Sequence, residues 1–297
     1  MKDYLVTALA SKEQIRAFAI TSKNLVEEIR KIHNYSPIAI AALGRTLSAS
    51  LMMGEMLKNK EDLLTIIIKG DGPLKQIVVT SNHNGEAKGY ASVPDVILPP
   101  NDKGHLNVGG AIGKGTLTVI KDYGLKEPYV STIDLVTSEI AEDLTYYFSQ
   151  SEQTPTAIGL GVLLNKQEVT VAAAGGFIVQ LMPNTPEETI TKLEDNLKKF
   201  TSVTDILRKN KTPEELLKIV LDGFDVQFTS TRDVFFRCSC SKEKGLNAIR
   251  TLSNEEIQEM IKENKDVEIT CDFCNKTYIY TPSDLEAILK EKENSHD

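Results

Sequence analysis

The sequence has few of the residues on which most catalytic sites depend. Its four histidines are His33, His83, His105 and His296, and none stands in a zincin, nucleophile-elbow or similar catalytic pattern. Carboxylates are plentiful, but no catalytic pair can be picked out, because most of them lie on expected solvated helix faces. The sequence therefore does not indicate an enzyme.

Long apolar runs are also missing. The first residues lack the apolar core of a secretory signal. The longest apolar stretch, residues 169–182, is interrupted by Thr170 and Gln180 and is too short to cross a bilayer. We therefore expect a cytoplasmic protein that does not bind membranes. Thiols stay reduced in that compartment, so clustered cysteines there indicate metal or redox chemistry more often than a disulfide framework.

Positive charge is in short supply. The chain has 34 Lys and Arg against 42 Asp and Glu, and its formal net charge is -8. An acidic chain is a poor general partner for nucleic acid or for anionic lipid. We therefore expect neither of these partners.

A glycine-rich segment at residues 109–116 resembles a phosphate-binding loop only superficially. Val108 occupies the position of the first glycine of that motif, and Gly115 follows Lys114 where Ser or Thr is required. The segment is therefore predicted to be a flexible turn rather than a nucleotide site.

The apolar pattern predicts an α+β fold with an N-terminal α/β core domain over residues 1–183, built from a mixed or antiparallel sheet and helices. Residues 37–58 carry Ala, Leu and Met almost all round, so we expect this helix to be buried. A loop is expected at residues 95–115. Strands are expected at 3–9, 15–20, 63–69, 76–80, 86–91, 116–121, 129–134, 156–164 and 167–174, and helices at 23–34, 37–58 and 138–150.

A helical linker is expected over residues 184–225. The strings Thr185-Pro186-Glu187-Glu188 and Thr212-Pro213-Glu214-Glu215 each offer a cap residue, Pro at the first helical position and Glu at the third. A short helical turn fits residues 203–208 between these two helices. Short helices are marginal alone, so the linker should depend on docking.

The last part, residues 226–297, is expected to form a small C-terminal domain. Its first strand is predicted at residues 226–237. Two helices near 242–250 and 254–264 follow, the second capped by Ser253 with Glu256. A strand pair around residues 271–274 and a helix after Pro282 complete it.

Four cysteines, the only ones in the sequence, lie in this domain as two close pairs. Cys238 and Cys240 are separated by one residue, and Cys271 and Cys274 by two, with thirty residues between the pairs. Zinc takes four thiolates tetrahedrally, and two close pairs from separate turns build that geometry well. We therefore predict one zinc ion on these four residues. Four unconnected cysteines and an iron–sulfur cluster are the alternatives, and the spacing fits neither common ferredoxin pattern.

The same spacing suggests a redox switch. Residues two or three apart can come within disulfide range, so oxidation is predicted to join Cys238 to Cys240 and Cys271 to Cys274. Two local links would then replace one long-range metal tie and eject the metal. Because so small a domain relies on its metal for much of its folding free energy, we expect it to unfold.

The cysteine spacing after an α/β domain resembles the 33-kDa chaperonin (heat shock protein 33) family of redox-regulated holdase chaperones. The strings Ala41-Ala42-Leu43-Gly44-Arg45-Thr46 and Ser151-Glu152-Gln153-Thr154-Pro155 and residues 174–183 are similar to the family as well. The resemblance covers essentially the whole chain.

The resemblance implies a chaperone that acts without ATP. Its reduced, zinc-bound form would be inactive, with Cys238, Cys240, Cys271 and Cys274 as the ligands. Oxidants would form the two disulfides, release zinc and unfold the C-terminal domain and the linker. The exposed apolar surface would then bind unfolding client proteins, and activation would accompany formation of a homodimer.

The sequence fits two other functions less well. A zinc module for nucleic acid is disfavoured, because residues 231–297 hold ten Lys and Arg against fourteen Asp and Glu. A thiol oxidoreductase that uses Cys271 and Cys274 is disfavoured, because both cysteine pairs are needed by one metal. The side chains of Leu47, Leu51, Met52, Met53, Met56 and Leu57 are expected in the core. A weaker hypothesis makes them a client surface that the linker uncovers.

Overall fold

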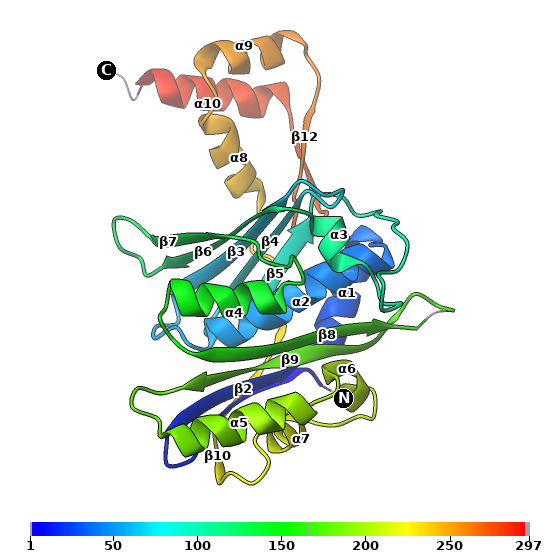
Figure 1. Cartoon of the computed structure of the whole chain (residues 1–297). Helices are drawn as coiled ribbons and strands as arrows, with labels where there is room; N and C mark the ends of the chain where they lie inside the picture. Colours follow the sequence, from blue (N-terminus) through cyan, green and yellow to red (C-terminus); the bar gives the residue numbers. More distant parts are fainter. Residues whose placement is uncertain (1, 166, 295–297) are drawn as a thin grey trace. The chain divides into compact units, whose positions relative to one another are not determined.

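The structure is a computed structural model that describes residues 2–165 and 167–294 (Figure 1). The chain divides into two compact units, Met1–Arg237 and Cys238–Asp297. The second unit thus begins later than residue 226, where the sequence placed it. The reason is that the strand which starts at Val226 pairs with the first strand of the chain and so belongs to the first unit. His296 lies outside the described residues.

Two sheets, one of five strands and one of six, form the first unit within the described residues. All neighbouring strands are antiparallel except β11 and β5, which are parallel. The five-stranded sheet has the order β10-β1-β2-β9-β8 and consists of β1 (Tyr4–Ala10), β2 (Ile15–Thr21), β8 (Thr156–Leu164), β9 (Val171–Leu181) and β10 (Val226–Asp233). The six-stranded sheet has the order β11-β5-β4-β3-β6-β7 and consists of β3 (Leu63–Gly70), β4 (Gln76–Asn82), β5 (Glu86–Ala91), β6 (Gly115–Asp122), β7 (Tyr129–Asp134) and β11 (Phe235–Phe236).

The main core lies between these two sheets around helix α2 (Pro37–Gly54). Among the described residues, α2 is the one helix long and apolar enough to span a bilayer, but 89% of it is buried in this unit. It is therefore a core helix. Together with the two mainly antiparallel sheets, the helices confirm the expected α+β architecture. The helices that accompany it are α1 (Lys23–His33), α3 (Val108–Ile112) and α4 (Ala141–Gln150).

The linker helices cover the other face of the five-stranded sheet (Figure 1). They are α5 (Glu187–Lys199), α6 (Val203–Leu207) and α7 (Pro213–Val220). A second apolar cluster forms beneath them. Its members from the sheet are Val6, Ala8, Ala10, Ile15, Ala17, Ala19, Ala173, Phe177 and Val179, and those from the linker are Leu193, Val203, Leu207, Leu216, Leu217, Val220 and Leu221.

This arrangement contradicts the weaker hypothesis about the Met and Leu side chains of α2. Leu47, Met52 and their neighbours lie in the core between the two sheets, and the five-stranded sheet separates them from the linker. Departure of the linker would therefore uncover the outer face of that sheet and not α2. The prediction that these residues lie in the core is confirmed.

Of the two caps predicted in the linker, one forms. The Thr212 hydroxyl accepts from the Glu215 backbone N–H, and the Glu215 carboxylate accepts from that of Thr212. Helix α5 instead has Pro186 as its N-cap. The Thr185 hydroxyl is oriented elsewhere, because it donates to the backbone oxygens of Gln14 and Met182.

Asp3 is a buried carboxylate beside the start of α1. It is 5% exposed and accepts hydrogen bonds from the Leu25 backbone N–H at 2.8 Å and from the Asn24 side chain at 3.1 Å. Burial is the strongest influence on this group and raises its pKa to about 6, although backbone hydrogen bonds from α1 oppose the change. Its protonated form is therefore favoured by folding.

The raised pKa of Asp3 predicts a loss of stability with rising pH. The contribution of this group is complete below about pH 4 and is lost as the pH rises through its folded-state pKa of about 6. Asp3→Asn should remove this dependence, which is on the order of 3 kcal/mol in the free energy of unfolding. Urea unfolding across this pH range measures it. The exposed carboxylate change Asp102→Asn is the control, and identical pH slopes for wild type and Asp3→Asn would contradict the prediction.

Candidate metal centre

The four cysteines lie in the C-terminal unit on two separate segments. Cys238 and Cys240 precede helix α8 (Lys242–Arg250), whose cap Ser241 accepts from the Lys244 backbone N–H. Cys271 and Cys274 lie in the turn of the hairpin formed by β12 (Val267–Thr270) and β13 (Thr277–Tyr280).

Backbone hydrogen bonds shape that hairpin turn. The Cys271 N–H donates to the Lys276 oxygen at 3.0 Å, and the Asn275 N–H donates to the Cys271 oxygen at 2.8 Å. Asn275 has φ 58, a left-handed conformation that asparagine tolerates better than most residues. The turn therefore brings both of its sulfurs to one side.

The four sulfurs form one compact cluster. All four Sγ atoms lie within 4.8 Å of one another, and each residue is a partly exposed free thiol. Cys238 Sγ and Cys271 Sγ are 3.7 Å apart, and Cys240 Sγ and Cys274 Sγ are 3.3 Å apart. Four sulfurs at about 2.3 Å from a zinc ion would be separated by roughly 3.8 Å. The donor set and its spacing are therefore compatible with a tetrahedral zinc site.

The thiols of the cluster differ in acidity. The Tyr278 hydroxyl, 3.3 Å from Cys240 Sγ, is the main influence that lowers the pKa of Cys240 to about 7. Burial raises the pKa of Cys274 to about 12 and also raises that of Cys238. A metal that needs four thiolates must therefore displace protons when it binds.

Tyr278 is a residue of the site that the sequence did not reveal. Its hydroxyl also donates to the Cys240 backbone oxygen at 3.1 Å, so it contacts both the sulfur and the backbone of one cysteine. An aromatic residue in a short strand is more often a core residue than a partner of a sulfur. The hairpin register, which pairs Ile269 with Tyr278, decides where this ring lies.

A small apolar core supports the cluster. It consists of Ile249, Ile257, Tyr280, Leu285 and Ile288, with some partly buried neighbours. These residues come from β13, α8, α9 (Asn254–Lys262) and α10 (Pro282–Asn294). The predicted capping box of Ser253 and Glu256 begins α9. So few buried side chains contribute little to the folding free energy of a unit of this size. A bound metal would supply much of the remaining folding free energy.

The glycine-rich segment at residues 109–116 has a packing role in the structure. It contributes the short helix α3, which the sequence did not predict, and the start of β6. The Asp71 carboxylate accepts from the Lys114 backbone N–H at 2.7 Å. A side chain at Gly113 would clash with that carboxylate, since an added Cβ would lie 2.1 Å from its oxygen.

Comparison with known proteins identifies the family. The family model described as Hsp33 protein matches residues 3–281. The chain belongs to the Hsp33 family. Its relatives include the 33 kDa chaperonin of Clostridioides difficile, which is 49% identical over 98% of this chain and 100% of its own length. The 33 kDa chaperonin of Caldanaerobacter subterraneus is also 49% identical, over 99% of this chain and 100% of its own length.

A solved Hsp33 structure has the same architecture. The crystal structure of the 33 kDa chaperonin (heat shock protein 33 homolog) from Thermotoga maritima matches with a TM-score of 0.90 at 34% identity. The match covers 99% of this chain and 100% of that one. Membership of the Hsp33 family supports a chaperone role for this protein.

Removal of any bound metal should unfold the C-terminal unit and leave the core around α2 intact. We expect a zinc chelator, or the change Cys271→Ser, to raise amide hydrogen exchange in α8, α9 and α10 to the rate of an unfolded chain. Exchange in α2 should not change, because that helix lies in the separate core of the first unit. Mass spectrometry of peptides measures both regions.

The control for this experiment is Ser239→Ala. Ser239 lies between two of the cysteines, but its hydroxyl accepts from Lys244 and offers no sulfur. This variant should keep its protection against exchange. If α8 to α10 stayed protected in the chelated protein, the metal would not be what holds this unit together.

Proposed function

We propose that this Hsp33-family protein is a redox-regulated holdase that acts without ATP and prevents the aggregation of unfolding proteins. The observation that carries the proposal is the single cluster of Cys238, Cys240, Cys271 and Cys274. In the reduced form these four thiolates would hold one zinc ion, which supplies the tie between two segments of a small unit. That reduced form is inactive.

Oxidation converts the four sulfurs into two disulfides. Each disulfide forms when two thiolates lose two electrons to one peroxide, which takes up two protons from solvent and becomes two waters. In the reduced cluster all four sulfurs are close, so proximity alone does not select the partners. Oxidation of a first thiolate to a sulfenic acid removes one zinc ligand, so the metal can leave and the two segments can separate before the disulfides close. Only residues two or three apart then stay near each other. The products are therefore Cys238–Cys240 and Cys271–Cys274.

Loss of the metal is coupled to release of the linker, residues 184–225. The linker is the next helical segment toward the N-terminus, and its three helices are too short to be stable without docking. Its departure would uncover the apolar outer face of the five-stranded sheet, which includes Val6, Phe177 and Val179. Such a face binds the exposed apolar segments of an unfolding protein.

The remaining properties follow from the same scheme. The activated protein forms a homodimer, since a second copy can cover part of the uncovered face. It acts in the cytoplasm, where thiols are reduced until oxidants appear. Its net charge of -8 disfavours nucleic acid and anionic membranes as partners. Binding and not catalysis is its activity.

The proposal is tested by an oxidation experiment on the whole chain. Reduced, zinc-loaded protein should leave the aggregation of a thermally unfolding client almost unchanged. After peroxide treatment, about one zinc per chain should be released, and light scattering by the client should fall several-fold without ATP. Mass spectrometry should find Cys238 joined to Cys240 and Cys271 to Cys274. If zinc stays bound after oxidation, or if the oxidised protein suppresses aggregation no more than the reduced protein does, the proposal is wrong.

Weakened docking of the linker should give activity without oxidation. Leu217 on α7 is fully buried against the five-stranded sheet, and Leu217→Ala should destabilise docking by about 2–5 kcal/mol. We expect the reduced variant to suppress aggregation at least in part. Ile219→Ala on the same helix is the matched control, because Ile219 is 43% exposed. A Leu217→Ala variant that folds, keeps its zinc and stays inactive would argue against this client surface.

A further inference from the structure

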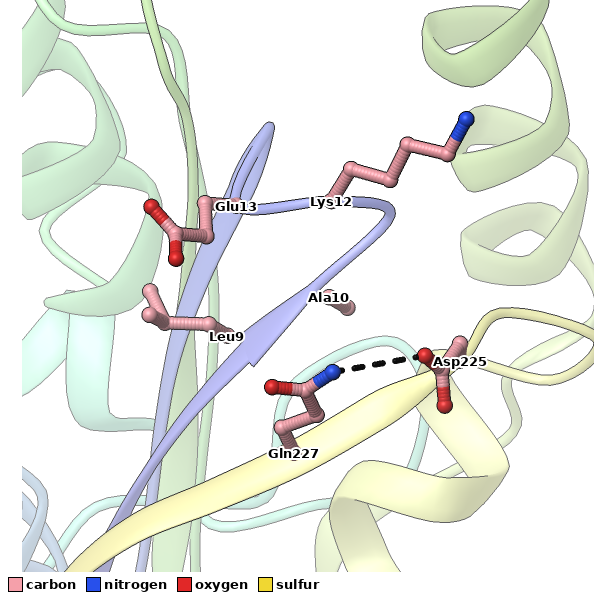
Figure 2. Close-up of a pocket in the computed structure, with 6 residues that line it drawn as sticks. All are labelled: Leu9, Ala10, Lys12, Glu13, Asp225 and Gln227. Atoms are coloured by element: carbon pink, nitrogen blue, oxygen red, sulfur yellow. Dashed lines mark hydrogen bonds between the residues drawn. The ribbon is translucent and has the colours of Figure 1, made fainter.

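The turn between β1 and β2 has an unusual backbone. Ser11, Lys12 and Glu13 have φ angles of 50, 54 and 66, so three consecutive residues are left-handed. None of them is glycine or asparagine, the residues that adopt this conformation most readily. Such strain persists only where surrounding contacts impose it. The side chains of Lys12 and Glu13 are exposed, and Figure 2 shows them pointing away from each other at the tip of the turn.

The first set of contacts on this turn comes from the start of the linker. The Gln14 backbone oxygen accepts from the Met182 N–H at 2.9 Å and from the Thr185 hydroxyl at 3.0 Å. The Gln14 side-chain oxygen accepts from the hydroxyl of Thr189, which is only 6% exposed, at 3.2 Å, and from that of Ser11 at 2.9 Å. Helix α5 is thus attached to the turn through its first residues.

The second set comes from the end of the linker. The Ser11 backbone N–H donates to the Asp225 oxygen at 3.3 Å. Immediately after Asp225, the chain joins the sheet, where Val226 pairs with Ala10. Asp225 and Gln227 line a shallow hollow together with Leu9, Ala10, Lys12 and Glu13 (Figure 2). One strained turn therefore contacts both ends of a segment of about forty residues.

We propose that the β1–β2 turn, residues 11–14, is a strained catch for the linker. Its hydrogen bonds hold both linker ends in place, and the docked linker in turn holds the backbone of the turn in its left-handed conformation. When the linker leaves, these contacts disappear and the turn relaxes. The strain therefore favours release. It makes the free-energy difference between the docked and the released linker smaller than the apolar contacts alone would set it.

The catch rests on the proposed release of the linker, but it can be tested without oxidant or client. Amide hydrogen exchange is measured in α5 to α7 of the reduced, zinc-loaded full chain. Lys12→Asn with Glu13→Gly relieves the strain and leaves the hydrogen bonds of Ser11 and Gln14 intact. This variant should slow exchange in the linker by about tenfold. Gln14→Ala removes the nearer acceptor of the buried Thr189 hydroxyl and leaves only Ser11 Oγ at 3.5 Å, so it should accelerate exchange several-fold.

Two control variants make the test specific. Lys75 also has a left-handed backbone, with φ 63, in the connection between β3 and β4, which is part of the other sheet. Lys75→Gly relieves similar strain there and should leave exchange in the linker unchanged. Gln227→Ala removes an exposed side chain that lines the hollow and reaches only the Asp225 carboxylate, at 3.5 Å, and not the backbone oxygen that Ser11 binds, so it should also have no effect. Exchange in α2 reports whether each variant keeps its core.

The outcomes separate the catch from the proposed function. If relief of the strain at Lys12 and Glu13 does not slow linker exchange, or if Lys75→Gly slows it equally, the catch is wrong even where oxidation activates the protein. If the two turn variants shift exchange in opposite directions, the catch stands. A protein that behaves in this way but gains no activity on oxidation would refute only the holdase mechanism.

Discussion

The five-stranded sheet has apolar side chains on both faces, and both faces must be covered. Alternation along β1 and β2 divides them: Leu5 and Phe18 face the core around α2, whereas Val6 and Ala17 face the linker. The helices that cover these two faces differ in length and in how they are packed. Helix α2 is long, apolar all round and enclosed between two sheets, while the linker offers three short helices with one apolar side each. One face is therefore covered by a helix enclosed in the core, and the other by short helices that depend on docking to the sheet.

The C-terminal unit has the same weakness for a related reason. Its core of a few buried side chains is small, so four sulfurs from two segments carry much of the organisation. Both the linker and this unit thus depend on something outside their own secondary structure, a sheet face in one case and, in the proposed function, a metal in the other. Their neighbouring positions in the sequence make a joint loss of order physically reasonable, whereas the core around α2 shares neither dependence.

Short-range patterns predicted most strands, most helices and the cysteine cluster, because alternation, caps and spacing are local properties. The prediction was wrong where distant contacts decide. Strand β9 was expected to end near residue 174, but it continues to Leu181 through Gly175 and Gly176. Glycine there permits close packing, since a Cβ at Gly175 would lie 2.1 Å from the Ile20 oxygen. Likewise, nothing local indicated that Val226 would pair with Ala10, or that Tyr278 would meet a sulfur.

The pairing of β10 with β1 also has a consequence for how the protein is made. Strand β1 leaves the ribosome shortly before its partner β2, but its other partner, β10, lies more than two hundred residues later in the chain. At about 5–20 residues per second, that delay is roughly 10–45 s. For most of this time only β1 and β2 of that sheet have been made. Once β8 and β9 follow, the sheet has an open edge at β1 and its outer face lacks the linker, which is synthesised later still. Each newly made chain thus passes through a stage in which it presents the surface that the finished protein hides.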